Sequence, residues 1–352
     1  MSKKGQRRGK AIARKRREEP SRIESIASTS SAMFHYTTAS GLIGILESGS
    51  LWATHANFLN DSAECRLLNR LLTPQIKSEF EKIVPELTAR GAFVPDIMKS
   101  LGGDAMSTEA EKVTNSILRA IDRTSPIYVT SFCMHEINSP ECDHGLLSQW
   151  RGYGKGGFAI EFDEAALDDL TKLEVKHHSY QSMMTRKVEY DNHADAANLS
   201  SFTGIANAAL KVAFEDAAPI LATREDVAEI LGSGDLTNYV GAFISVLPFL
   251  KSPRFKEENE YRIVALPTRS RYLVEESGDA RPWKETYFRE NAIGSVVPFI
   301  QLFKDTGAPL PIKKVIVGPH RDQENQTLAA TLLLEKYGFD VPVVSSDTTL
   351  RF

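Results

Sequence analysis

The sequence has few cysteines, no long apolar run and no apolar leader. Three cysteines in 352 residues are too few for a disulfide framework, so we expect a reducing compartment, the cytoplasm. No run of about 18 apolar residues occurs, which argues against a membrane-spanning helix. The first residues are charged rather than apolar, unlike a secretory signal peptide. We therefore expect a protein that is neither secreted nor anchored in a membrane.

The markers of several enzyme classes are also missing. A glycine cluster over 152–157 precedes a predicted strand, whereas a Rossmann or Walker loop opens a helix. No Gly-x-Ser-x-Gly elbow marks a serine hydrolase. Cys133 and His135, like Cys142 and His144, are zinc-binding residue types, but each pair is separated by one residue instead of two or more. We therefore expect no metal at these positions.

Charge is distributed unevenly along the chain. Residues 1–22 contain ten Lys and Arg against two Glu, which leaves 32 basic and 44 acidic residues in 23–352. Residues 1–30 contain no aromatic side chain, and this composition predicts a disordered basic arm. Such an arm either attracts nucleic acid phosphates through residues 3–22 or serves only as a solubilising tail.

The remainder, 31–352, is predicted to form one α+β domain. Strand patterns and helical patterns alternate irregularly, without the steady βαβ rhythm of a doubly wound sheet. Two long segments, about 61–122 and 195–250, are mainly helical in pattern and are predicted to be insertions. Strands are expected at 33–37, 51–54, 127–132, 157–162, 260–264, 314–318 and 341–345, and shorter helices at 40–46, from 164 and at 324–336. The helix at 40–46 is predicted to have Ser40 as its N-cap and to end at Gly49.

Three clusters carry side chains suited to chemistry. In a strand, Glu258, Glu260 and Arg262 line one face, where two carboxylates beside a guanidinium suit ribose hydroxyls or a cationic transition state. The alternative is a half-exposed strand with its charged side in water. Trp150 and Tyr153 either form a stacking wall for a planar ring or, at helical spacing, pack onto the core. The third cluster surrounds a histidine at position 35, which either meets a ribose hydroxyl or is structural.

Short motifs recur in a distinctive order along the chain. They are Phe34-His35-Tyr36-Thr37, Ile45-Leu46-Glu47-Ser48-Gly49-Ser50-Leu51-Trp52, Phe58-Leu59-Asn60-Asp61-Ser62-Ala63-Glu64, Ser131-Phe132, Leu147-Ser148-Gln149-Trp150-Arg151-Gly152-Tyr153, Glu258-Asn259-Glu260-Tyr261-Arg262 and Val315-Ile316-Val317-Gly318-Pro319. With this set, the chain from about Met33 to Phe352 resembles the bacterial domain-of-unknown-function family 2971. The layout is also similar to that of the ADP-ribosyltransferase superfamily, which implies a central mixed or split sheet and NAD as substrate.

The second resemblance implies a role for each matching residue. His35 and Thr37 contact the adenosine-side ribose, and Tyr36 and Ser131 belong to the same NAD-binding set. Tyr153 or Trp150 stacks on the nicotinamide. Glu260 is the catalytic carboxylate, with Glu258 positioning the acceptor, and Arg262 orients Glu260 or binds pyrophosphate. Asn60 and Asp61 are further candidates, although Asp61 also fits a helix-capping box with Glu64.

The activity expected from this resemblance is cleavage of the nicotinamide–ribose bond, by transfer of ADP-ribose or by hydrolysis. The basic arm suggests nucleic acid, or a protein bound to it, as acceptor, and a role in toxin action or antiphage defence suits such an enzyme. Two alternatives stay open. One is a non-catalytic nucleotide-binding sensor or interaction module, and the other is a nuclease or hydrolase that gathers Asp61, Glu258 and Glu260 around a divalent cation.

Overall fold

The structure is a computed structural model. It describes residues 31–59, 126–153, 157–190, 247–268, 280–291 and 294–348, with short and mostly helical pieces between 73 and 115. The chain divides into two units, Met1–Ser30 and Ser31–Phe352. The predicted arm and most of the two predicted insertions therefore lie outside the described residues. No helix in the described part is both long enough and apolar enough to cross a membrane.

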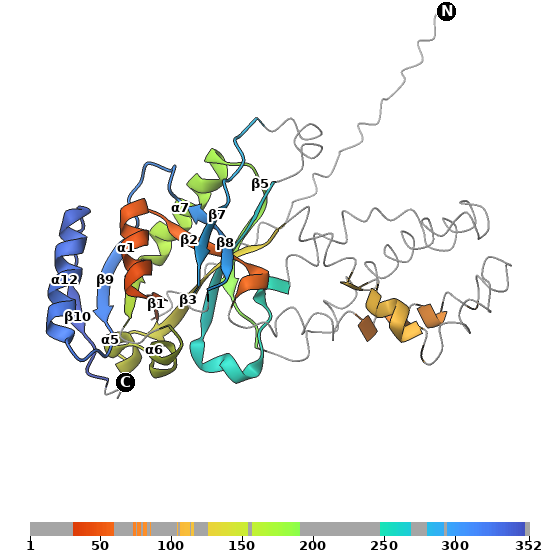
Figure 1. The fold of residues 1–352 in the computed structure, drawn as a ribbon, viewed down its shortest axis with the longest axis horizontal. Coiled ribbons are helices and arrows are strands. Elements are labelled where there is room, and N and C mark those ends of the chain that lie inside the picture. The colour runs from red at the N-terminus through yellow and green to blue at the C-terminus, as the bar shows by residue number, and fades with distance from the viewer. Residues whose placement is uncertain are drawn as a thin grey trace, which may run out of the picture. The chain divides into compact units, whose positions relative to one another are not determined.

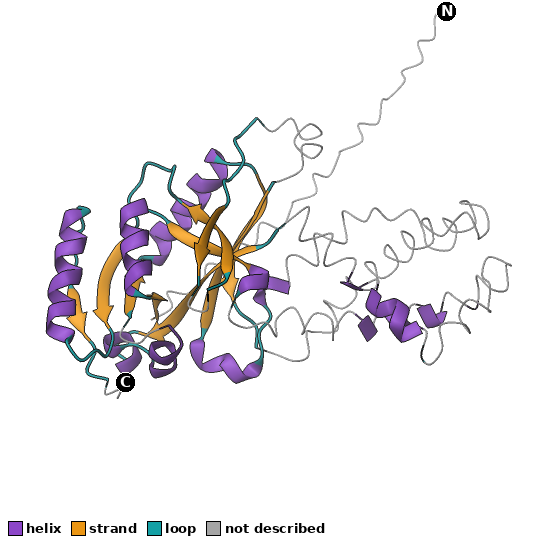
Figure 2. Cartoon of the chain, in the orientation of Figure 1, coloured by secondary structure: helices purple, strands orange, loops and turns teal. Residues whose placement is uncertain are grey.

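The described part contains one large mixed sheet with helices around it (Figure 1; Figure 2). The strands follow the order β10-β9-β4-β1-β3-β2-β8-β7, and β6 pairs with both β3 and β5. Only the β9–β10 pair is parallel among the pairs described, so the predicted α+β class is confirmed. The strands are β1 Ser31–Thr37, β2 Leu51–His55, β3 Tyr128–Glu136, β4 Phe158–Phe162, β5 Tyr180–Lys187, β6 Glu260–Pro267, β7 Tyr287–Glu290, β8 Val296–Leu302, β9 Ile312–Val317 and β10 Val343–Ser345.

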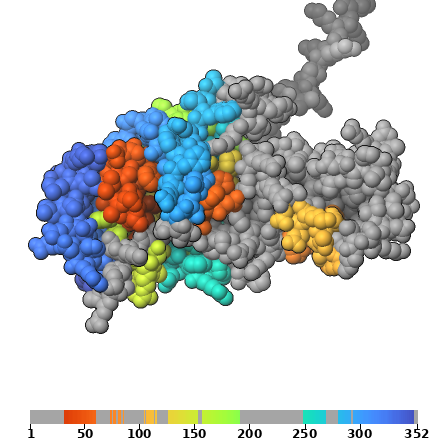
Figure 3. Space-filling model, viewed as in Figure 1, coloured from red at the N-terminus to blue at the C-terminus, as the bar shows by residue number. Residues whose placement is uncertain are grey.

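The helices pack on the sheet through two separate apolar cores. The larger core joins the strands to α1, α7 and α12, and the smaller one joins β1 and β3 to α5 and α6. On the face drawn in Figure 3, α1 lies between α12 and the β7–β8 pair. The helices are α1 Ala39–Ser48, α5 Pro140–His144, α6 Leu147–Tyr153, α7 Glu164–His177 and α12 Gln323–Lys336, with 3-10 helices η1 Ala56–Phe58, η2 Leu247–Phe249 and η3 Pro253–Glu258.

The first helix shows how local sequence sets the element bounds. Thr38 is the N-cap, and its Oγ1 accepts a hydrogen bond from the Gly41 amide at 3.2 Å, so the predicted cap at Ser40 is wrong. Gly49 ends the helix in the left-handed region, with φ of 59°, as the sequence predicts. The capped α1 therefore begins directly after β1 and presents its first turn beside that strand.

Strand β3 has two neighbours on one edge, and they diverge. Strand β6 pairs with β3 along Tyr128–Cys133 on the other edge. On the edge that β1 and β2 share, β1 pairs with the Cys133–Glu136 end of β3. Strand β2 pairs only with Tyr128 and Val129 at the other end. Neither register includes Thr130–Phe132. The sheet is therefore split at this point, and the split separates β1 from β2 beside the middle of β3.

Candidate functional site

A pocket of about 190 Å³ lies in this split. Its walls come from the ends of β1 and β2, the middle of β3 and the first turn of α1. The side chains of Gln149, Glu258, Glu260 and Arg289 complete its lining. Of the residues that the sequence marks as candidates, His35, Tyr36, Thr37, Ser131, Glu258 and Glu260 are therefore brought together at one pocket.

His35 bridges the split. Its Nδ1 donates a hydrogen bond to the Ser131 carbonyl oxygen at 2.9 Å, which fixes the proton on Nδ1. Burial lowers the pKa of His35, and the Arg289 charge lowers it further, while the bond to Ser131 acts in the opposite direction. A neutral imidazole with its proton on Nδ1 leaves Nε2 as an acceptor. His35 can therefore accept a hydrogen bond from a ligand hydroxyl.

Glu260 opens strand β6 and is held by cations on one side. Arg262 donates from Nε to Oε1 at 2.7 Å and from Nη2 to Oε2 at 3.0 Å, while Lys251 donates to Oε2 at 2.9 Å. Ser131 also forms a side-chain hydrogen bond with this carboxylate. Burial raises the pKa of Glu260, but Arg262, Lys251 and Ser131 together hold it below its ordinary value. Glu260 is therefore a charged carboxylate at the pocket, although only 3% exposed.

Strand register explains why these side chains meet. Residues directly opposite each other in an antiparallel pair place their side chains on the same face. Cys133 faces Glu260 and Ser131 faces Arg262, so all four share one face of the β3–β6 pair. The predicted grouping of Glu260 with Arg262 on one strand face is therefore confirmed.

Glu258 reaches the pocket by another route than the predicted one. It is the last residue of η3, and Asn259, with φ of 41°, turns the chain before β6 begins. The prediction that Glu258 lies in the same strand as Glu260 is therefore wrong. Lys251 nevertheless joins the two carboxylates, since its Nζ also donates to Glu258 Oε2 at 2.8 Å. We call Lys251, Glu258, Glu260 and Arg262 the Glu260 cluster.

Arg262 lies behind Glu260 and does not line the pocket. It is buried, and its Nη1 donates to the Pro248 carbonyl oxygen at 2.6 Å. This enclosure fits the predicted role of orienting Glu260 and leaves no access for a pyrophosphate. A bidentate guanidinium also fixes the plane of the carboxylate, which a single ammonium does not do.

Trp150 belongs to the smaller core. It is 1% exposed, packs edge to face on Tyr36 with ring centroids 4.9 Å apart, and donates from Nε1 to the His144 carbonyl oxygen at 3.0 Å. The structure thus contradicts its predicted stacking on a ligand and supports the core alternative. Tyr36 reaches the pocket, but its hydroxyl is bound to His135 Nε2 at 2.9 Å and accepts from the Leu146 amide at 2.7 Å. The side chain of Tyr153 lies outside the described residues.

Sequence reasoning missed three pocket or cluster residues: Lys251, Gln149 and Arg289. Arg289 lies on β7, where its Nη2 donates to Thr54 Oγ1 at 3.1 Å and its guanidinium lies 5.9 Å from the Trp52 ring. Gln149 lies within the Leu147–Tyr153 motif, in which the spacing pattern involves the aromatic residues Trp150 and Tyr153 and not Gln149. Lys251 follows the long segment 191–246 and has no pattern around it, so no signal in the sequence identifies it.

Other predicted residues lie elsewhere. Asn60, Asp61 and the basic segment 3–22 lie outside the described residues. Within the described ranges, His, Cys, Asp and Glu side chains form no group of three or more suited to a metal ion. Burial raises the pKa of Cys133 well above its ordinary value, which makes it an unreactive thiol.

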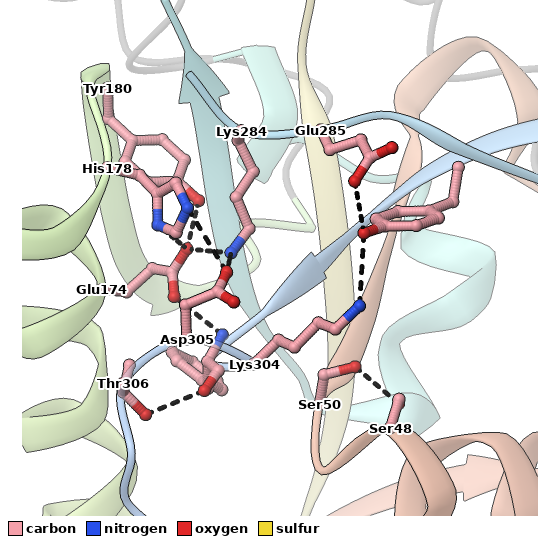
Figure 4. A network of polar contacts seen from close by, with 12 residues as sticks. Ser48, Ser50, Glu174, His178, Tyr180, Lys284, Glu285, Lys304, Asp305 and Thr306 are labelled. Carbon is pink, nitrogen blue, oxygen red and sulfur yellow. Dashed lines mark hydrogen bonds and ion pairs between the residues drawn. The ribbon is translucent and has the colours of Figure 1, made fainter. Parts of the chain in front are cut away.

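A second cluster, which we call the Glu174 cluster, consists of Glu174, His178, Tyr180, Lys284 and Asp305 (Figure 4). None of these residues lines the pocket. Glu174 accepts hydrogen bonds from Lys284 at 2.7 Å, from the Tyr180 hydroxyl at 2.6 Å and from the Phe303 amide at 2.8 Å. His178 lies between this carboxylate and Asp305, 3.6 Å from Glu174 and 3.3 Å from Asp305. The Glu174 cluster therefore serves for comparison, because its buried carboxylate has no access to the pocket.

The family profile described as protein of unknown function (DUF2971) matches residues 149–263. The predicted resemblance to this family is confirmed over that segment, which begins in α6 and ends in β6. It therefore contains Gln149 and the whole Glu260 cluster. No curated protein matches the chain, and no solved structure does so either.

Proposed function

We propose that this protein cleaves the nicotinamide–ribose bond of NAD and passes ADP-ribose to an acceptor or to water. One observation carries the proposal: His35 of β1 and Glu260 of β6 border the same pocket in a split sheet, and Ser131 is hydrogen-bonded to both. A hydrogen-bond acceptor and a fixed negative charge then both border one opening. Such groups can bind a ribose hydroxyl and stabilise the positive charge that develops on the ribose when nicotinamide leaves.

The proposed reaction places positive charge on the ribose. Departure of nicotinamide gives the anomeric carbon oxocarbenium character, as in glycoside cleavage. A preorganised carboxylate stabilises that charge, and Glu260 stays ionised because Arg262 and Lys251 lower its pKa. The Glu258 side chain is 18% exposed, and among the described residues its one ion pair is with Lys251, so Glu258 is better placed than Glu260 to meet an acceptor. His35 Nε2 would accept a ribose hydroxyl.

The phosphates of NAD need a cation or backbone donors. Arg289 lines the pocket, and so does the first turn of α1 at Thr38, Ser40 and Gly41. A helix N-terminus favours negative charge, and a guanidinium matches phosphate geometry. We therefore transfer the pyrophosphate role from Arg262 to Arg289. Nucleic acid, recruited by residues 3–22, remains our proposed acceptor.

A second candidate is a nucleotide-binding module without turnover. It is favoured by the contacts of Glu260, since each of its oxygens already accepts from Arg262 and one also accepts from Lys251. A carboxylate that already accepts this many hydrogen bonds can bind a ribose hydroxyl only if one of the existing bonds breaks. NAD would then be bound but not cleaved.

The test is nicotinamide release from NAD by purified protein, with RNA, DNA or cell lysate as added acceptor. We compare wild type with Glu260→Gln and Glu258→Gln, and use Glu174→Gln as a matched control for losing a buried carboxylate. We expect release to fall about a hundredfold or more in Glu260→Gln, by a smaller factor in Glu258→Gln, and to be unchanged per folded molecule in Glu174→Gln. Circular dichroism and urea titration give the folded fraction.

The outcomes separate the candidates. Binding of NAD without release under any condition would support the binding module. Neither binding nor release by a folded wild-type protein would overturn both proposals. Release that survives Glu260→Gln unchanged would remove Glu260 from the chemistry.

A further inference from the structure

Gln149 lines the pocket with an amide for which the described residues show no hydrogen-bond partner. The residue is only 4% exposed, and its amide atoms are not among the fully buried polar atoms that lack a partner in the described part, so they are open to the pocket. An amide that reaches a pocket loses its bonds to water when a ligand displaces that water, which costs about 1–3 kcal/mol unless the ligand supplies a partner. A side chain of this kind at the wall of a pocket indicates a polar group on the ligand.

The helix that carries Gln149 is fixed by its neighbour. Trp150 fills a space that only glycine leaves open, because a Cβ at Gly145 would lie 2.3 Å from its ring and one at Gly318 would lie 2.8 Å from it. The Tyr36 hydroxyl also accepts from the Leu146 amide just before the helix. Gln149 is therefore presented from a rigid element, as binding groups require. Trp150 has a positioning role for its neighbour instead of the predicted stacking role.

The chemistry of an amide restricts the ligand group that it recognises. Gln149 offers two N–H donors and one carbonyl acceptor in one plane. A primary carboxamide on the ligand offers the same set in the opposite order, so the two can form a pair of N–H···O bonds. A carboxylate offers only acceptors and would also meet the negative charges of Glu258 and Glu260, which line the same pocket. The wall around Gln149 therefore favours a neutral carboxamide.

We propose that Gln149 recognises the carboxamide of the nicotinamide ring and so selects the leaving group. This inference rests on the proposed function, since it assigns a specificity residue to the same pocket. It gives Gln149 a role in binding the base and none in binding the ADP-ribose part of the ligand.

The test compares two ligands that differ in the base. One is a carbocyclic NAD analogue whose nicotinamide bond cannot be cleaved, and the other is ADP-ribose, which lacks the base. Calorimetric titration is carried out on wild type, Gln149→Leu and Gln149→Glu. Gln301→Leu is the matched control, because Gln301 is also buried with an unpartnered Oε1 but does not line the pocket.

We expect Gln149→Leu to weaken the NAD analogue about tenfold or more and to change ADP-ribose affinity less than twofold. Gln149→Glu, which keeps the size but adds a charge and loses the donors, should weaken the analogue too, again with ADP-ribose retained. Gln301→Leu should alter neither ligand. ADP-ribose binding by the variants shows that the pocket is folded.

Three results would overturn the assignment. Equal weakening of both ligands by Gln149→Leu would mean a structural role, and unchanged affinity for both would mean no role. Wild type that binds the analogue no better than ADP-ribose would remove the base contact while leaving the proposed function in place. Wild type that binds neither ligand would overturn the proposed function itself, and this inference with it.

Discussion

The Glu260 cluster and the Glu174 cluster are built from the same materials. Each joins a buried lysine to two carboxylates, Lys251 to Glu258 and Glu260, and Lys284 to Glu174 and Asp305. In the Glu174 cluster the central carboxylate is fully enclosed, and donors from the chain itself occupy both of its oxygens. In the Glu260 cluster both carboxylates border a pocket.

The difference teaches where a buried charge indicates function. Glu174 supports the fold, since it binds the amide of Phe303, a residue with the unusual φ of 72°. This backbone conformation is costly for a bulky side chain and needs such support. The donors that the described residues provide to the Glu260 carboxylate are side chains, and this residue borders the pocket. The central carboxylate is buried and paired with a lysine in both clusters, so these two features do not indicate function, whereas access to a cavity does.

The largest expected effect comes from Lys284→Met. This change leaves the enclosed Glu174 without its cation, and we expect the free energy of unfolding to fall by about 3–5 kcal/mol. Urea denaturation at pH 7 measures it. NAD cleavage per folded molecule should be unchanged. A loss below about 1 kcal/mol, or a loss of cleavage by the folded variant, would break the contrast between the clusters.

His135, which contacts the pocket residue Tyr36, should make the stability of the fold sensitive to acid. Burial lowers the pKa of His135 from 6.5 to about 4, with Glu141 acting weakly in the opposite direction. Between these values the unfolded chain takes up a proton that the folded protein does not. We therefore expect unfolding free energy to fall by roughly 3 kcal/mol as pH drops from 6.5 to 4. His135→Gln, which keeps a partner for Tyr36, should abolish this part of the pH dependence in denaturation curves.

Lys251→Met should act on chemistry more than on stability. Removing Lys251 raises the pKa of Glu260 and takes away the hydrogen bond that Glu258 accepts from Lys251. The acid limb of the cleavage pH profile should therefore move to higher pH. The expected loss of stability is about 2 kcal/mol, because the pocket offers the carboxylates some solvent. Lys251→Arg should restore the profile. An unshifted profile in Lys251→Met would mean that these carboxylates do not control the rate.

The smallest effect is expected at the pocket rim. Arg289→Gln should weaken the NAD analogue and ADP-ribose alike by about tenfold, equal to about 1.4 kcal/mol, without a change in unfolding free energy. Arg254→Gln, at an exposed arginine of η3 that does not line the pocket, is the control. Selective loss of one ligand only would contradict a phosphate contact.

Strand and helix positions were largely predictable, because periodicity and caps act locally. The patterns around His35, Ser131 and Glu260 predicted three strands that the structure contains. Glu258 was misplaced because the left-handed turn at Asn259 interrupts the alternation, and asparagine tolerates that turn without leaving a clear signal. The α1 cap was misplaced by two residues for a similar reason, since Thr38 and Ser40 both suit a cap.

The residues that complete the site were not predictable from local pattern. Lys251 meets Glu260 only because the chain returns to the same place after a long segment, and Arg289 reaches the pocket across β8 and β2. The helical spacing of Trp150 and Tyr153 favours the core, and only the resemblance implies a ligand wall. The enclosure of Trp150 depends on Gly145 and Gly318, which lie 5 residues before it and 168 residues after it in the sequence. Contacts of this kind come from topology, which a single sequence does not reveal.

The pairing of β5 with β6 has a consequence for how this chain tolerates change. Glu189 and Leu250 bridge the ends of the segment between them, and Arg186 faces Arg262 in the strand register. The cost of closing a loop grows only with the logarithm of its length, about 0.6 kcal/mol per doubling. The chain therefore leaves the sheet after Glu189 and returns to it at Leu250 at adjacent points, and the free energy of closing the chain between these anchors depends only weakly on its length.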